Sequence, residues 1–211
     1  MHGALAMKDP ILENLFHTCT EAITAANEIL ATARQALMAR ISRDGKINTK
    51  LLEKEQFAAH GFAWLNTYVE GLRHMLAWGQ RLESRDAQGE LELLMVQAAF
   101  GEYLNQIDGG IAISQVEVVR LSDIGIDKKA QDGFYNDAAN LLMHRGNTNT
   151  VRIRIAELIA DGHFGELGLM DSALEMIRDQ FRRFVDKNVK PDAHQWHLKD
   201  EFIPMPLIEQ M

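Results

Sequence analysis

Two pairs of residues have the types and the spacing that could bind a metal ion. Glu13 and His17, and likewise Glu70 and His74, stand four positions apart and would share one face of a helix. A di-iron helical bundle, however, needs Glu-x-x-His on two helices and two further glutamates. The chain contains no Glu-x-x-His. We therefore interpret both pairs as surface ion pairs and predict no metal ligand.

Two other groups of reactive side chains have simpler explanations. His194 and His197 flank Trp196, but two histidines alone are weak zinc ligands, so we interpret them as packing residues. Cys19 falls on an apolar helical face, where a buried structural thiol is expected rather than a nucleophile. The sequence therefore predicts no catalytic residue.

The composition predicts an intracellular globular protein. Of its 211 residues, 46% are apolar and 25% are charged, which is ordinary for a chain with a sizeable core. The net charge of −8 argues against a nucleic-acid surface or an anionic membrane surface, since both attract clustered lysine and arginine. A single cysteine excludes an intrachain disulfide and suits a reducing compartment. Without a signal peptide or an apolar run of about 20 residues, we expect a cytoplasmic protein with no membrane insertion.

Helical signals dominate the first half of the chain. Asp9 before Pro10 predicts a helix start, and apolar residues then recur at spacings of three and four to about residue 41. A turn at 42–49 should lead into a second helix over 49–83. That helix carries two adjacent apolar seams, so we expect it to bury about half its circumference against two neighbours. The first seam is Ala58, Phe62, Leu65, Val69, Leu72, Leu76 and Gly79; the second is Phe57, Gly61, Trp64, Tyr68, Gly71, Met75 and Trp78.

The second half is also predicted to be helical. A third helix should end at Gly109-Gly110, and Ser114 with Glu117 predicts a capping box and a short helix to about residue 121. Further helices are expected over 129–144 and 148–161. Three glycines at 162–168 then favour a linker, and Gly165-x-x-Gly168 is too short for a phosphate loop. We predict an all-α fold with an up-down helical bundle over 1–163, a linker over 164–170 and a separate helical segment over 171–211.

The C-terminal segment resembles the first two helices of acyl-CoA dehydrogenases. It has a capping box at Ser172 and Glu175 and an amphipathic helix with R-D-Q-F-R-R-F-V at 178–185. A turn closed by Pro191, a segment with Trp196 and M-P-L-I-E-Q-M at 205–211 follow. Leu207, Ile208 and Met211 should form an apolar edge that nothing in the sequence covers. The resemblance implies the start of the family's N-terminal helical domain.

The predicted bundle resembles the extra N-terminal region of long-form acyl-CoA dehydrogenases, of the kind that oxidise methylsuccinyl-CoA. The residues that carry this resemblance are A-A-H-G-F-A-W-L-N-T-Y-V-E-G-L-R at 58–73 and G-E-Y-L-N-Q-I-D-G-G-I-A-I-S-Q-V-E-V-V-R at 101–120. The chain departs from the family pattern at Ala112 and Val116, where proline and glycine are expected, so the local turn should differ. The two resemblances together cover most of the chain.

The resemblance implies an FAD-dependent enzyme that oxidises the α,β bond of an acyl-CoA and passes electrons to an electron-transferring flavoprotein, as a homo-oligomer. None of the family's flavin-binding or catalytic motifs occurs in this sequence. We therefore assign no catalytic, cofactor-binding or metal residue and expect the chain alone to be inactive. The alternative is a non-catalytic helical module for assembly or partner binding.

Two surfaces could still contribute to ligand binding. A basic cluster could recognise a coenzyme A phosphate, although nearby Asp179 and Asp186 favour a solvated helix face. It consists of Arg178, Arg182, Arg183, Lys187 and Lys190. Trp64 and Trp78 could line a pocket, but core or subunit packing is the preferred interpretation.

Overall fold

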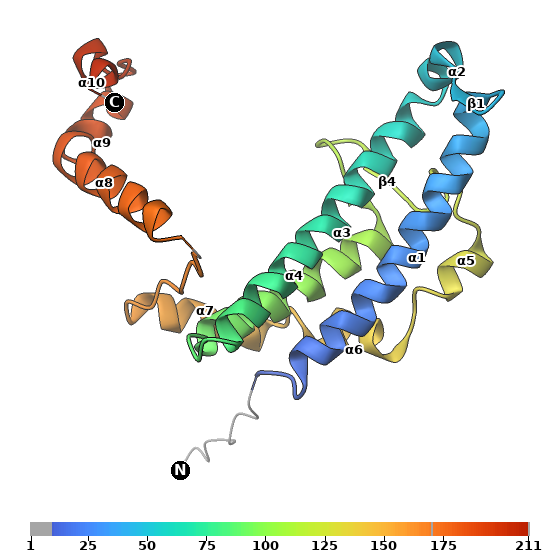
Figure 1. Cartoon of the computed structure of the whole chain (residues 1–211), viewed down its shortest axis with the longest axis horizontal. Coiled ribbons are helices and arrows are strands. Elements are labelled where there is room, and N and C mark those ends of the chain that lie inside the picture. Colours follow the sequence, from blue (N-terminus) through green and yellow to red (C-terminus); the bar gives the residue numbers. More distant parts are fainter. Residues whose placement is uncertain (1–9, 170, 211) are drawn as a thin grey trace. The chain divides into compact units, whose positions relative to one another are not determined.

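The computed structural model describes residues 10–169 and 171–210, and within them it is all-α, as predicted (Figure 1). The chain divides into two compact units, of which the first ends at Glu166 and the second begins at Leu167. The helices of the first unit are α1 Leu15–Ile41, α2 Thr49–Lys54, α3 Gln56–Glu83, α4 Glu90–Gly109, α5 Lys128–Asp132, α6 Asp137–Arg145 and α7 Asn149–Ala160. Those of the second are α8 Ser172–Asn188, α9 Lys190–Leu198 and α10 Met205–Glu209. No helix in the described ranges is long and apolar enough to cross a membrane.

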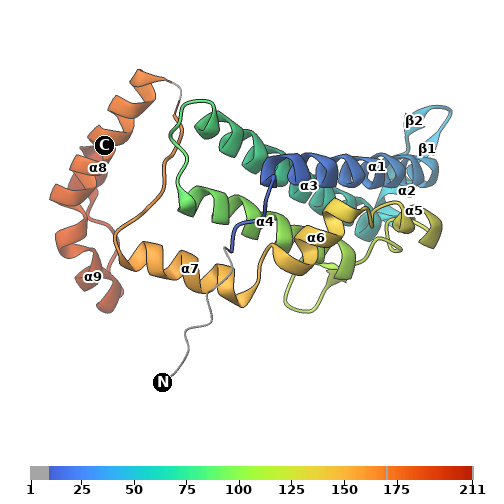
Figure 2. The same cartoon turned by 90° about the horizontal axis from the view of Figure 1, so that it is seen from below.

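Three long helices, α1, α3 and α4, form the centre of the first unit. Figures 1 and 2 show α1 beside α3, and α6 crosses both α1 and α4. Alanines fill much of the inner face of α1, which lets the neighbouring helices approach closely; examples are Ala22, Ala26 and Ala33. Opposite them lie the buried side chains of Leu65, Val69, Leu72, Phe100 and Leu104.

A close approach between α4 and the chain that follows α6 needs a glycine. A Cβ at Gly101 of α4 would lie 2.6 Å from the backbone nitrogen of Asn147, at the end of α6. Any side chain there would push the two helices apart. Gly101 therefore sets the distance between α4 and the chain that follows α6.

The predicted start of the first helix is wrong. Asp9 lies outside the described residues, and Pro10 is not helical, because α1 begins at Leu15 after Asn14. The reason is a tertiary contact: the side chain of Gln97 on α4 accepts a hydrogen bond from the Leu12 amide (2.7 Å) and donates one to the Pro10 carbonyl (2.9 Å). These bonds hold the backbone of residues 10–12 in a non-helical path.

The second predicted helix forms, but it is broken at Glu55 into α2 and α3. Asn48 caps α2 by accepting a hydrogen bond from the Leu51 amide (3.1 Å). The turn itself contains a short hairpin of β1 Ser42–Arg43 with β2 Lys46–Ile47.

The helix α3 packs against both α1 and α4, which confirms the expected two neighbours. Its first seam is mostly buried, with Leu65, Val69 and Leu72 fully inaccessible. The second seam is only partly buried, since Trp64 and Trp78 keep part of their surface in solvent. Within the described residues, part of the second seam therefore stays in solvent.

The predicted short helix after Ser114 is also wrong. These residues form the loop of a hairpin in which β3 Ile111–Ala112 pairs with β4 Val118–Val119. The hydroxyl oxygen of Ser114 does accept a hydrogen bond from the Glu117 amide (3.1 Å), as in a capping box, but the bond closes the loop instead of starting a helix. Val116, one of the departures from the family pattern, lies exposed at the tip.

Two of the three remaining predicted helices of the first unit form as expected, and the third is interrupted. The third predicted helix is α4, which ends before Gly110 at φ 122°. The predicted 148–161 helix is α7. The predicted 129–144 helix is interrupted between α5 and α6, because the buried side chain of Phe134 anchors the connecting turn.

The second unit contains three helices where the resemblance implies two, because the segment with Trp196 forms α9, and two details differ. The side chain of Asp171, not of Ser172, caps α8 by accepting a hydrogen bond from the Ala173 amide (2.8 Å). Pro191 lies in the first turn of α9, after α8 has ended. Leu207 is buried, so the expected uncovered edge is reduced to the half-exposed Ile208, while Met211 lies outside the described residues.

Candidate functional site

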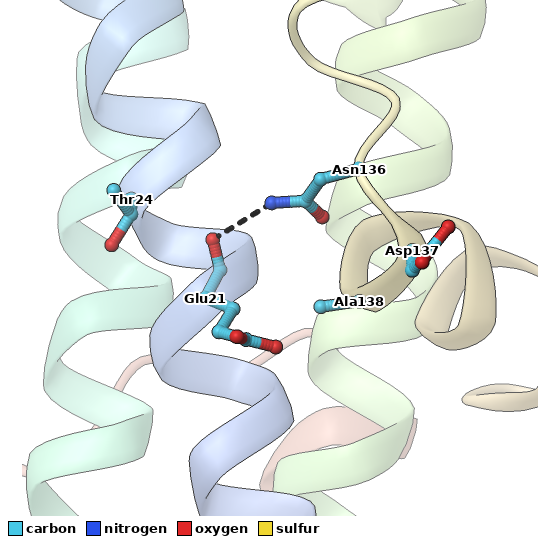
Figure 3. A pocket seen from close by; sticks show the side chains of 5 residues that line it. All are labelled: Glu21, Thr24, Asn136, Asp137 and Ala138. Atoms are coloured by element: carbon cyan, nitrogen blue, oxygen red, sulfur yellow. Dashed lines mark hydrogen bonds between the residues drawn. The ribbon is translucent and has the colours of Figure 1, made fainter.

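A shallow pocket lies between α1 and the start of α6 (Figure 3). Asn136 caps α6 and donates a hydrogen bond across the pocket to the Glu21 carbonyl (3.1 Å). The two charged side chains that line it, Glu21 and Asp137, are both acidic. Carboxylates repel phosphates, so the lining does not suit a nucleotide or a coenzyme A group.

A chain of hydrogen bonds connects α3, α4 and the loop before α7. The hydroxyl of Tyr68 donates to the side-chain carbonyl of Gln106 (2.7 Å), whose amide donates to Glu102 (2.7 Å). Glu102 also accepts a bond from Asn147 (2.8 Å). The ring of Tyr68 stacks on Tyr103, with centroids 4.6 Å apart. The network satisfies the hydrogen-bonding groups of polar side chains that lie between packed helices.

The network shifts two pKa values. Hydrogen bonds from Gln106 and Asn147 hold the pKa of Glu102 below its usual value. Partial burial raises the pKa of Tyr68, with a smaller contribution from Tyr103. A lowered carboxyl pKa and a raised phenol pKa keep both groups in their ordinary charge states near neutral pH. Neither group is tuned for proton transfer at that pH.

A second pocket, of about 510 Å³, lies where α4 begins and α7 ends. Two guanidinium nitrogens of Arg154 donate to the two carboxylate oxygens of Glu90 (2.6 Å each), and a third bond reaches Glu157 (3.3 Å). The paired Arg154 lowers the pKa of Glu90. Since Glu90 and Glu157 already occupy the guanidinium, Arg154 ties α7 to α4 and is a poor candidate for binding an anionic ligand.

The pairs considered as metal ligands have other partners. Glu70 pairs with Arg73, which also bonds to Asn27 on α1, and His17 lies 3.6 Å from Glu21. No group of three or more histidine, cysteine, aspartate or glutamate side chains that could hold a metal occurs in residues 10–169 and 171–210. That the chain has no metal ligand therefore stays a prediction.

Cys19 is fully buried, as expected, and burial raises its pKa. A protonated, inaccessible thiol is not a nucleophile. In the second unit His194 and His197 are exposed, on either side of the half-buried Trp196.

The basic cluster, which lies on α8 and at the first residue of α9, is largely solvated. Arg178 pairs with Asp179 (2.9 Å), and Lys190 pairs with Asp186. These ion pairs favour the interpretation of the cluster as a solvated helix face and not as a site for a coenzyme A phosphate.

The buried polar residues of α4 were missed in the sequence analysis. Glu92 and Gln97 are both buried, and each uses its side chain to bind backbone from a distant segment. Each interrupts a stretch of apolar residues, and that was the available signal. Glu92 also stands three positions after Gly89, where a glutamate can bond back to the start of its helix.

No protein-family profile matches the chain. The chain is, however, 48% identical over 206 residues to the (2S)-methylsuccinyl-CoA dehydrogenase of Cereibacter sphaeroides. It is a relative of part of that acyl-CoA dehydrogenase. The match includes 96% of this chain but only 37% of the relative, so the chain spans little more than a third of that protein's length. The resemblance found in the bundle and in the C-terminal segment is thereby confirmed.

Proposed function

We propose that this chain is the N-terminal portion of an FAD-dependent acyl-CoA dehydrogenase that oxidises the α,β bond of a short branched, methylsuccinyl-like acyl-CoA. The observation that carries the proposal is the 48% identity over 206 residues, because one relative accounts for both units of the chain. A helical module borrowed from an unrelated protein would not also match the dehydrogenase-like tail.

We assign the first 163 residues to an N-terminal helical extension, 164–170 to a linker and 171–211 to the start of the dehydrogenase's N-terminal helical domain. Two features support this division. The first unit has a continuous apolar core of its own, and the amphipathic helix α8 begins after the linker. In the whole protein, we expect the acyl-CoA, an electron-transferring flavoprotein and further copies of the chain as partners.

In such an enzyme FAD would accept the hydride. The two pockets described above do not fit FAD. The pocket at α1 and α6 is acidic, and Arg154 in the pocket at α4 and α7 is already paired. A flavin pyrophosphate needs free donors or cations. We therefore derive no reaction step from these residues and propose a structural role for the extension.

The second apolar seam of α3 suggests what the extension contacts. Trp64 and Trp78 remain partly exposed, and Phe57 more so. Aromatic side chains are enriched at interfaces, so we propose that this face packs against another domain or subunit of the whole enzyme.

Flavin content tests the proposal. The purified chain should be colourless after gel filtration, whereas a longer product of the same gene should bind FAD and reduce an artificial electron acceptor with methylsuccinyl-CoA. A yellow preparation of the chain with stoichiometric flavin would show that flavin-binding residues are present here. A longer product with no flavin and no dehydrogenase activity would favour the non-catalytic module, which the independent core of the first unit also allows.

A further inference from the structure

The last residue of the first unit, Glu166, is held from both sides of its peptide backbone. Its amide donates a hydrogen bond to one carboxylate oxygen of Glu92 (2.7 Å). Its carbonyl accepts one from the indole nitrogen of Trp78 (3.1 Å). Glu92 and Trp78 belong to two different helices of the core, α4 and α3.

The carboxylate of Glu92 is itself fixed. Only 6% of this residue is exposed, and its second oxygen accepts a hydrogen bond from the Gly89 amide (2.8 Å) at the start of α4. Bonds from backbone amides to a carboxylate are among the stronger ones in proteins, and a buried carboxylate that loses them is costly. The bond from Glu92 to Glu166 therefore starts from a buried carboxylate, whereas the bond from Trp78 to Glu166 lies at the surface.

The glycine-containing segment at 162–168, which these bonds to Glu166 restrain, has the composition of a flexible linker. Gly162 and Gly165 have φ values of 90° and 75°, a region that glycine enters readily. A Cβ at Gly165 would lie 3.5 Å from a carboxylate oxygen of Glu92, so this glycine lies directly against that carboxylate. Composition alone would place the hinge within these glycines.

We infer that Glu92 and Trp78 form a clasp that fixes the point where the chain leaves the first unit, so that the ordered backbone of the first unit continues through Gly162 and Gly165 to Glu166. The division of the chain between Glu166 and Leu167 agrees with this position. The inference does not depend on the proposed enzymatic function, because every contact that carries it lies within the first unit.

Chymotrypsin can test the clasp, since two exposed phenylalanines provide matched sites. Phe164 is 81% exposed and precedes the anchored residue; Phe202 is 96% exposed and lies between α9 and α10. A protease cleaves only a segment that opens locally. In the whole chain, cleavage after Phe164 should be about tenfold slower than after Phe202.

Two variants weaken the clasp differently. Trp78→Phe removes the indole N–H that donates to the Glu166 carbonyl. Glu92→Gln replaces one carboxylate oxygen by an NH2 group, so the side chain can no longer accept hydrogen bonds from both the Gly89 and the Glu166 amides. Each should raise the rate at Phe164 about tenfold and leave the rate at Phe202 unchanged. Hydrogen exchange at the Glu166 amide should accelerate in parallel in Glu92→Gln. The control is Glu157→Gln, which removes the ion pair with Arg154 without touching Glu166.

Equal wild-type rates at Phe164 and Phe202 would overturn the inference, as would unchanged rates at Phe164 in both clasp variants. Should Glu92→Gln unfold the start of α4 and expose many sites, Trp78→Phe decides, because it leaves the Glu92–Gly89 bond intact. No acceleration at Phe164 in Trp78→Phe would then contradict the clasp.

Discussion

The two units use the same helical periodicity with different results. In the first unit the apolar face of α1 meets α3, and side chains such as Ala22 and Ile29 are buried. In the second unit the apolar face of α8 has equally regular spacing, yet Leu174, Ile177 and Phe181 remain about half exposed. Periodicity therefore determines which face of a helix is apolar, but the neighbouring elements determine how much of that face leaves water.

The largest expected effect comes from deleting a core ring. Phe100 is fully buried among α1, α3 and α6, so Phe100→Ala should lower the free energy of unfolding of the first unit by about 3–5 kcal/mol. Phe181→Ala on α8 should cost less than about 1.5 kcal/mol, since half of that residue is already in solvent. Urea unfolding followed by circular dichroism measures both. Similar losses for the two variants would show that the units do not differ in packing.

The next effect comes from a polar residue inside the first unit. Gln97→Leu keeps the volume of the side chain but leaves the buried amide of Leu12 without its acceptor. We expect a loss of about 1–3 kcal/mol, the usual cost of an unsatisfied buried polar group. Amide exchange at Leu12 should accelerate more than exchange in the middle of α3. A neutral Gln97→Leu substitution would mean that the segment before α1 can find another partner.

Gln97 also shows where sequence reasoning succeeded and where it could not. The long helices follow from local periodicity and from glycine and proline positions, and these predictions were confirmed. The separate C-terminal domain stays a prediction. The start of α1, the hairpin at Ser114 and the break at Phe134 depend on partners far away in sequence, such as the bond from Leu12 to Gln97 across 85 positions. The role of Glu92 could not be predicted for the same reason, because its side chain bonds to Glu166, which lies 74 positions away in the sequence.

A smaller effect concerns the pH dependence of the first unit. The folded-state pKa of Glu102 is lowered by bonds from Gln106 and Asn147, so its contribution to stability is present above its ordinary value of 4.5 and is lost as the pH falls through the folded-state pKa. Because the side chain is partly exposed, solvent screens its interactions and we expect less than about 1 kcal/mol. The stability difference between the wild type and Glu102→Gln should shrink as the pH is lowered from 6 to 3 (roughly spanning the glutamate range). A difference that stays constant with pH would contradict the assignment.

The smallest expected effect is on turnover by the whole enzyme. His60 lies exposed on α3, and its imidazole accepts a hydrogen bond from the Trp64 indole (3.0 Å), while Glu70 is occupied by Arg73. Both residues hold neighbouring side chains in place, and we have assigned neither a role in the chemistry. Replacing His60, Glu70 or His74 by alanine should therefore leave kcat nearly unchanged in an enzyme that retains its flavin. Loss of turnover in His60→Ala or Glu70→Ala, with folding and flavin content intact, would show that this face of the extension reaches the active site, and the structural role proposed for the first unit would be wrong.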